Sequence, residues 1–311
     1  MAATEALERL RAGGKPALAR ALAAIEAAPE AAATLDLLDA AWADPRAYVI
    51  GLTGPPGVGK STLVAALVRL WRAQGRTVAV IAVDPTSRRS GGALLGDRTR
   101  LDLDPDDDGV FVRSMAARDR LGGVAALTAA AAGLMQATHD LVLIETVGVG
   151  QSETDIAELA DTVLLAVQPG SGDSLQYMKA GIAEIPDVAV VGKADLGPLA
   201  ERTRRDLEAA LHLQSHPGQA WTVPVLAASA RDGSGIDGLA EALEAHRLHL
   251  AAGLAAHRRR RERVWLRSAV RDLHGSRGLA RATVRLAGLL DDDSRSPWRR
   301  LVLIGAGLDA T

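Results

Sequence analysis

One nine-residue stretch constrains the fold more than any other part of the chain. It reads GPPGVGKST over residues 54–62, with the apolar run AYVIGLT before it and the helix-forming run TLVAALVRLW after it. The spacing G-x-x-x-x-G-K-[ST] between a strand and a helix is typical of a loop whose backbone N–H groups surround phosphate oxygens. Glycines let that backbone curl, and the dipole of the following helix attracts an anion. The sequence therefore predicts a phosphate-binding loop at the end of a buried strand.

Further apolar, β-branched runs follow, with helical segments between them. The runs are continuous rather than alternating, which is expected of strands buried on both faces of a sheet. They lie at residues 47–53, 77–83, 141–145, 162–167, 188–192 and 222–229. We therefore expect an α/β fold, a doubly wound and mostly parallel sheet of the P-loop NTPase class, over residues 47–247.

The two ends of the chain read differently from this central region. Residues 1–46 are alanine-rich with helical spacing, and Pro29 divides them into two expected helices of an N-terminal extension. Residues 248–311 form an expected C-terminal helical region, with a loop at 290–297. Its basic run Arg258–Arg261 could bind an acidic partner, but one solvated face of a long helix is the favoured interpretation.

Composition excludes several classes of protein. The 311 residues include no cysteine, which removes zinc–thiolate sites, iron–sulfur clusters and cysteine nucleophiles. The net charge of -2 argues against general binding to nucleic acid or to a membrane surface. Because no apolar run reaches ~18 residues, we expect no transmembrane helix. We expect a cytoplasmic protein.

The phosphate-loop motif predicts a role for several of its residues. Lys60 would reach the β- and γ-phosphates of a nucleotide, the Ser61 hydroxyl would ligate magnesium, and Thr62 would lie near the α-phosphate. The predicted phosphate-contacting residues are Gly54, Pro55, Pro56, Gly57, Val58, Gly59, Lys60, Ser61 and Thr62.

Two expected strands end in acidic residues, Asp84 and Glu145. Ligands bind at the carboxyl ends of strands in such sheets. Each carboxylate therefore either ligates magnesium or lies next to a magnesium ligand, or it caps a helix. A place at or next to the magnesium ion is the favoured interpretation. Asp97, in the glycine-rich stretch LGDRTR, could also close over magnesium.

The segment ETVGVGQSE begins at Glu145 and resembles the D-x-x-G switch of GTPases with Glu for Asp. The N–H of Gly148 would then contact the γ-phosphate. Gln151 is a candidate for positioning the attacking water, although an exposed surface glutamine is an equally good interpretation.

The stretch GKAD, residues 192–195, resembles the base-reading loop Asn-Lys-x-Asp with Gly192 in place of asparagine. The Asp195 carboxylate would accept hydrogen bonds from guanine N1–H and the exocyclic amine, which adenine cannot supply. Lys193 would cover the base, and losing the asparagine amide would cost up to about tenfold in affinity. A second loop over Ser229, Ala230 and Arg231 would offer a backbone N–H to guanine O6.

Taken in order along the chain, these segments resemble the MeaB/ArgK GTPases, the chaperones associated with methylmalonyl-CoA mutase. The resemblance covers about residues 10–250 and rests on GPPGVGKST, VDPTS, GGALLGDRTR, RSMAARDRLGGVA, ETVGVGQSE, QPGSGDSLQYMKAGI and GKADL. It implies a homodimeric, magnesium-dependent GTPase with slow turnover. Its implied partner is an adenosylcobalamin-dependent acyl-CoA mutase, which would bind the cobalamin itself.

The same resemblance implies particular roles within this chain. GTP binding and hydrolysis would gate cofactor loading and would protect or rescue the mutase. Lys179 would lie in a switch loop that changes conformation when the mutase binds, and it would turn toward the nucleotide in the complex. The alternative interpretation is an exposed lysine on a helix. Residues 248–311 would build the dimerisation arm, although their end, WRRLVLIGAGLDAT, departs from the family pattern.

Two other functions fit a phosphate loop. A kinase is disfavoured, because the chain carries guanine-reading loops and shows no obvious acceptor site. A metal-delivery GTPase of the nickel-insertion type would use Cys and His ligands. His246 and His249 could share one helical face, but with no cysteine in the chain a solvated helix is favoured.

Overall fold

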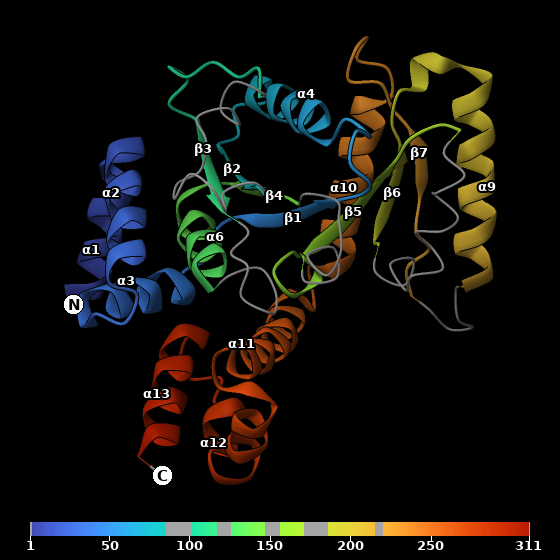
Figure 1. Ribbon diagram of the computed structural model, residues 1–311. Coiled ribbons are helices and arrows are strands. Elements are labelled where there is room, and N and C mark those ends of the chain that lie inside the picture. The colour runs from blue at the N-terminus through green and yellow to red at the C-terminus, as the bar shows by residue number, and fades with distance from the viewer. Residues whose placement is uncertain are drawn as a thin grey trace.

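A computed structural model describes residues 2–84, 101–116, 126–146, 156–170, 186–214 and 220–310. Its centre is a seven-stranded sheet in the order β3-β2-β4-β1-β5-β6-β7, in which every pair is parallel (Figure 1). The strands are β1 Tyr48–Thr53, β2 Val78–Asp84, β3 Val110–Ala116, β4 Leu141–Glu145, β5 Thr162–Val167, β6 Val188–Val191 and β7 Val225–Ala227. The predicted doubly wound α/β sheet is confirmed.

The two edge strands depart from the sequence prediction. Strand β3 was not expected, because its apolar run is interrupted by Arg113 and Ser114, which are only partly buried on this edge. Strand β7 is three residues long instead of the eight expected. Pro224 stands directly before it, and proline supplies no N–H for a strand ladder, so pairing begins only at Val225.

Both faces of the sheet are covered, as the continuous apolar runs predicted. On one face Ile50 and Leu52 of β1 pack with α4 (Lys60–Ala73) and α10 (Ile236–Leu250). On the other face Val49 of β1 packs with α6 (Ala126–Thr138) and with the N-terminal helices. Helix α9 (Pro198–Gln214) covers strands β5 and β6 on this second side. Alternate residues of β1 thus enter two separate cores.

The N-terminal extension is helical, with one more helix than expected. It consists of α1 Ala2–Ala12, α2 Gly14–Ala27 and α3 Ala32–Ala43, which lie beside α6 (Figure 1). The expected break at Pro29 separates α2 from α3. A further break separates α1 from α2, because Gly14 adopts a φ of +57° that a continuing helix cannot contain.

The C-terminal region is also helical and folds back on itself below the sheet (Figure 1). It contains α11 Leu254–Arg285, α12 Ala287–Leu290 and α13 Pro297–Asp309. Gly275 interrupts α11 with a φ of 71°. Ser296 caps the start of α13 by accepting a hydrogen bond from the Arg299 N–H, and the helix packs on both α11 and α3. The expected loop at 290–297 agrees with the irregular stretch between α12 and α13.

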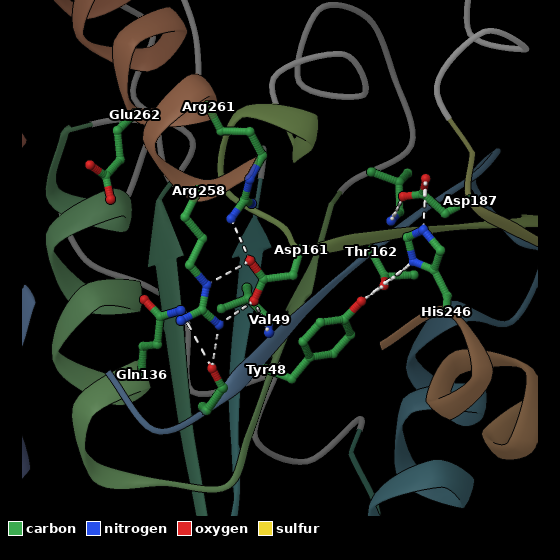
Figure 2. A network of polar contacts seen from close by, with 12 residues as sticks. Tyr48, Val49, Gln136, Asp161, Thr162, Asp187, His246, Arg258, Arg261 and Glu262 are labelled. Atoms are coloured by element: carbon green, nitrogen blue, oxygen red, sulfur yellow. Dashed lines mark hydrogen bonds and ion pairs between the residues drawn. The ribbon is translucent and has the colours of Figure 1, made fainter. Parts of the chain in front are cut away.

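The basic run in α11 does not form one solvated face. Arg259 and Arg260 are exposed, but Arg258 and Arg261 point inward to the buried carboxylate of Asp161 at the start of β5 (Figure 2). Arg258 Nε donates to Asp161 Oδ1 at 3.0 Å, and Arg261 Nη2 donates to the same oxygen at 2.5 Å. Burial alone would raise the pKa of Asp161, but the two guanidinium groups outweigh it and hold it below its usual value.

A second buried contact corrects the expectation for His246. Its side chain is 3% exposed rather than solvated, and its Nδ1 lies 2.7 Å from Thr162 Oγ1, which also contacts the Tyr48 hydroxyl (Figure 2). On the other side of the ring, Nε2 lies 3.4 Å from Asp187 Oδ1. These residues stand at the amino ends of β1, β5 and β6, whereas the phosphate loop follows the carboxyl end of β1. We therefore interpret the cluster as a structural tie between the sheet and helices α10 and α11.

Candidate nucleotide-binding site

The loop after β1 has the backbone shape that its glycines predicted. Gly54, Gly57 and Gly59 have φ values of 143°, 77° and 97°, a region in which other residues are strained. A Cβ atom on Gly54 would lie 2.0 Å from the carbonyl oxygen of Ala166 in β5, so only glycine fits there. Helix α4 begins at Lys60, directly after the loop, and the unpaired N–H groups of a helix start favour an anion there.

Lys60 is held over this loop. Its side chain is buried, and Nζ donates to the carbonyl oxygens of Gly54 at 2.7 Å and Pro55 at 3.1 Å. The ammonium group therefore lies next to the same backbone that would surround a phosphate group. An ammonium in this position can exchange carbonyl oxygens for phosphate oxygens without moving far along the chain.

Ser61 and Glu145 are brought together by the register of two strands. Strands β1 and β4 pair with Leu52 opposite Glu145, so the end of β4 lies beside the start of the loop. The Ser61 hydroxyl donates to Glu145 Oε1 at 2.7 Å. Magnesium is held in nucleotide sites by one or two protein oxygens together with phosphate and water, and this pair offers two such oxygens. The residues present fit the ion.

Other predicted residues of this site are not all described. Asp84 ends β2, two residues beyond the pair that joins Ala82 to Glu145, but its side chain lies outside the described structure. Asp97, Gly148, Gln151 and Lys179 also lie outside the described residues. Within the part of the chain that the structure describes, no group of three or more His, Cys, Asp and Glu could hold a metal ion.

The two predicted base-reading loops meet at Asp195. Ser229 Oγ donates to Asp195 Oδ1 at 2.8 Å, and Arg231 Nη1 lies 3.7 Å from the other carboxylate oxygen. The backbone N–H of Ala194 also donates to the carbonyl oxygen of Ala228, which joins the loops directly. Ser229 is fully buried, so its hydroxyl fixes the direction of the carboxylate.

Lys193 has a strained backbone conformation in the first base-reading loop. It is the one non-glycine residue with positive φ in the described ranges, at 55°. Its Nζ donates to the Gly57 carbonyl oxygen at 3.2 Å and to Gln168 Oε1 at 3.3 Å. The lysine therefore links the base-reading loop to the phosphate loop. Sequence reasoning missed Gln168, although its place directly after β5 at the carboxyl edge of the sheet was a signal.

These elements enclose a cavity of about 310 Å³ beside the phosphate loop. Its walls are the loop and the start of α4 on one side and the two base-reading loops on the other. The residues are Val58, Gly59, Thr62, Leu63, Ala166, Gly192, Lys193, Asp195, Ala228, Ser229, Ala230 and Arg231. The cavity brings the predicted base-contacting residues of two separate stretches of the sequence beside the predicted phosphate loop.

The parallel sheet and its phosphate loop define a P-loop NTPase, and comparisons with known proteins narrow the class. The family model described as methylmalonyl-CoA mutase-associated GTPase MeaB matches residues 18–282. A Pyrococcus abyssi protein named as a GTPase is 42% identical over 263 residues, which cover 84% of this chain and 81% of the relative. This chain is therefore a GTP hydrolase that belongs to the MeaB family.

Two further similarities agree with that family. The mouse protein named methylmalonic aciduria type A homolog, mitochondrial, is 38% identical over 228 residues, covering 71% of this chain and 55% of the mouse protein. The crystal structure of an LAO/AO transport system kinase superposes with a TM-score of 0.68 at 27% identity, covering 99% of this chain and 97% of the other. The expected family and the expected activity are confirmed. No helix in the described ranges is both long and apolar enough to span a membrane.

Proposed function

We propose that this GTPase is a chaperone of an adenosylcobalamin-dependent acyl-CoA mutase, methylmalonyl-CoA mutase or a relative. GTP binding and hydrolysis would gate the loading of the mutase with its cofactor and would protect or reactivate it. One observation carries the proposal: residues 18–282 match a family described as associated with that mutase. The name of the mouse relative, which refers to methylmalonic aciduria, supports the same class of partner.

The positions of the described site residues support the following proposed roles. Asp195, held by Ser229, would accept hydrogen bonds from the guanine edge, and the loop over Ser229, Ala230 and Arg231 would donate to O6. Lys60 would stabilise the charge on the β- and γ-phosphates. The remaining phosphate contacts would come from residues 54–62.

Ser61 and Glu145 would hold magnesium, with Asp84 and Asp97 as further candidates. Magnesium, when bound, would bridge phosphate oxygens and neutralise their charge. Gln151 and Gly148 would contact the attacking water and the γ-phosphate, and Lys179 would act when the partner binds. These last residues are proposed from the sequence alone.

The organisation of the whole protein is part of the proposal. Residues 1–46 would be an N-terminal extension, 47–247 the GTPase domain and 248–311 a helical arm for a homodimer. The mutase would bind the cobalamin. The cytoplasmic location expected from the sequence stays a prediction.

The test measures GTP hydrolysis with and without a purified cobalamin-dependent acyl-CoA mutase. We expect faster phosphate release with the mutase, and a complex on size exclusion in the presence of a non-hydrolysable GTP analogue. Lys60→Ala is the control for hydrolysis by this site, and an unrelated acyl-CoA enzyme is the control for the partner. Unchanged turnover with each cognate mutase, together with no complex, would contradict the chaperone role.

A further inference from the structure

Gly192 leaves one wall of the base cavity without a side chain. Its backbone N–H donates to the Val167 carbonyl oxygen, and the residue lines the cavity between Lys193 and the phosphate-loop residue Val58. A Cβ atom built on Gly192 would lie 3.3 Å from the Val58 carbonyl oxygen and 3.7 Å from that of Val167. This wall is therefore backbone, with the nearest groups being carbonyl acceptors.

A guanine base shows two chemically different edges to such a cavity. Its Watson–Crick edge carries the donors N1–H and the exocyclic amine and the acceptor O6. Its imidazole edge carries the acceptor N7, which a side chain can read only by donating a hydrogen bond. Asp195 accepts, so it suits the first edge. The Ala230 N–H has no partner among the described residues and suits O6.

Two side-chain donors of the cavity, Lys193 and Ser229, are hydrogen-bonded to other acceptors, and the Thr62 hydroxyl stands in the first turn of α4 beside the phosphate loop. Lys193 Nζ donates to Gly57 O and Gln168 Oε1, and the Ser229 hydroxyl donates to Asp195. Arg231 points toward Asp195, at 3.7 Å from its carboxylate. At the position where an amide would stand, Gly192 offers none.

We propose that this cavity reads guanine along the Watson–Crick edge alone and leaves N7 unread. The inference rests on the proposed base-reading site and deepens it, because it names the nucleotides that the site accepts. These are guanine nucleotides altered at position 7, with 7-deaza-GDP as the plainest example. That compound replaces N7 by C–H, keeps the shape of the base and keeps the whole Watson–Crick edge.

The experiment compares the dissociation constants of GDP, 7-deaza-GDP and ADP by calorimetry, for the wild type, Gly192→Ala and Gly192→Asn. We expect GDP and 7-deaza-GDP to bind the wild type within about twofold of each other. In Gly192→Asn the new amide can donate to N7, so 7-deaza-GDP should bind about threefold to tenfold more weakly than GDP. Gly192→Ala adds the Cβ without the amide and should keep the wild-type ratio.

The outcomes separate this inference from the proposed site. If the wild type prefers GDP to ADP but loses threefold or more on 7-deaza-GDP, some donor reaches N7 and the inference is wrong. It is equally wrong if the asparagine variant binds both guanine nucleotides alike, because residue 192 then does not face N7. Equal binding of GDP and ADP would overturn the base-reading site itself. Should Gly192→Asn fail to fold, the wild-type ratio decides alone.

Discussion

The Ser61 hydroxyl donates to Glu145 Oε1 at 2.7 Å, across the gap between the start of α4 and the end of β4. Two sequence motifs separated by more than eighty residues thus meet at one hydrogen bond. The parallel register that sets Leu52 opposite Glu145 is the cause, because it aligns the carboxyl ends of β1 and β4.

This contact predicts how the enzyme responds when Glu145 loses its charge. Glu145→Gln keeps the shape and removes a carboxylate from the expected magnesium site. We expect the magnesium concentration for half-maximal GTP hydrolysis to rise roughly 10–100-fold, since orienting residues at metal sites carry effects of that size. Titration of magnesium under saturating GTP measures it. Glu158→Gln is the matched control, because Glu158 bonds Ser268 away from the loop; equal effects of the two variants would contradict the assignment.

Asp195 predicts the choice between guanine and adenine. Hydrogen bonds to charged groups contribute ~1.5–3 kcal/mol, so Asp195→Ala should weaken GDP binding roughly 10–150-fold and leave ADP nearly unchanged. Competition between the two nucleotides for a fluorescent GDP analogue measures the ratio. Asp206→Asn is the control, because Asp206 is an exposed carboxylate that lies 3.9 Å from Arg202 on the same helix, α9. A preference for GDP that survives in Asp195→Ala would show that another group reads the base.

Gln168 predicts a smaller effect through Lys193. Its Oε1 accepts from Lys193 Nζ and helps to hold that residue in its strained backbone conformation. Gln168→Ala should weaken GDP binding about threefold to tenfold with no change in the preference over ADP. The exposed Gln74→Ala at the end of α4 should change neither quantity. If Gln168→Ala altered the GDP-to-ADP ratio instead, Gln168 would touch the base.

Buried histidines predict a loss of stability in acid. Burial lowers the pKa of His139 from 6.5 to about 4, so the folded state holds this side chain neutral where the unfolded chain would bind a proton. The associated stability is present above pH 6.5 and is lost as the pH falls toward 4. We expect it to amount to on the order of 2 kcal/mol in urea unfolding at pH 7 against pH 4.

The matched comparison uses the second buried histidine. Burial also lowers the pKa of His246 to about 4, but the facing Asp187 has a pKa raised by burial to about 6. The contribution of Asp187 is lost as the pH rises from 3.8 through 6, which offsets that of His246. Replacing either histidine by Gln should therefore remove a similar part of the rise in stability between pH 4 and 6.5, whereas Asp187→Asn should make that rise steeper. A stability profile that became flatter in Asp187→Asn would contradict this account.

The sequence predicted the features that depend on local chemistry. The phosphate loop needs glycines at fixed spacing, and the base-reading loops keep Lys193 and Asp195 next to a strand end, so these residues could be proposed as candidates without coordinates. The inward orientation of Arg258 and Arg261 could not be predicted, because no sequence pattern near α11 indicates that Asp161 is their partner. The same holds for Gln168 and for His246, whose partners lie on distant elements. Strand β3 was missed because an edge strand needs no continuous apolar run.

Loss of the buried Asp161 should strongly destabilise the fold. It is fully buried at the amino end of β5, where it accepts from Arg258, Arg261 and the Val49 N–H. Asp161→Ala would leave two guanidinium groups buried without their partner, which typically costs about 3–5 kcal/mol. Urea unfolding measures this loss.

GDP affinity provides the second readout for the same variant. Asp161 lies at the amino ends of the strands, whereas the phosphate loop follows the carboxyl end of β1. The folded fraction of Asp161→Ala should therefore bind GDP within about twofold of the wild type. Arg259→Gln is the control for charge removal in this region, since Arg259 is half exposed and lies 3.8 Å from Asp293. A surface pair of that kind contributes about 0–1 kcal/mol, so the control should unfold like the wild type. If Asp161→Ala unfolded at the same urea concentration as Arg259→Gln, this buried cluster would not be what ties α11 to the sheet.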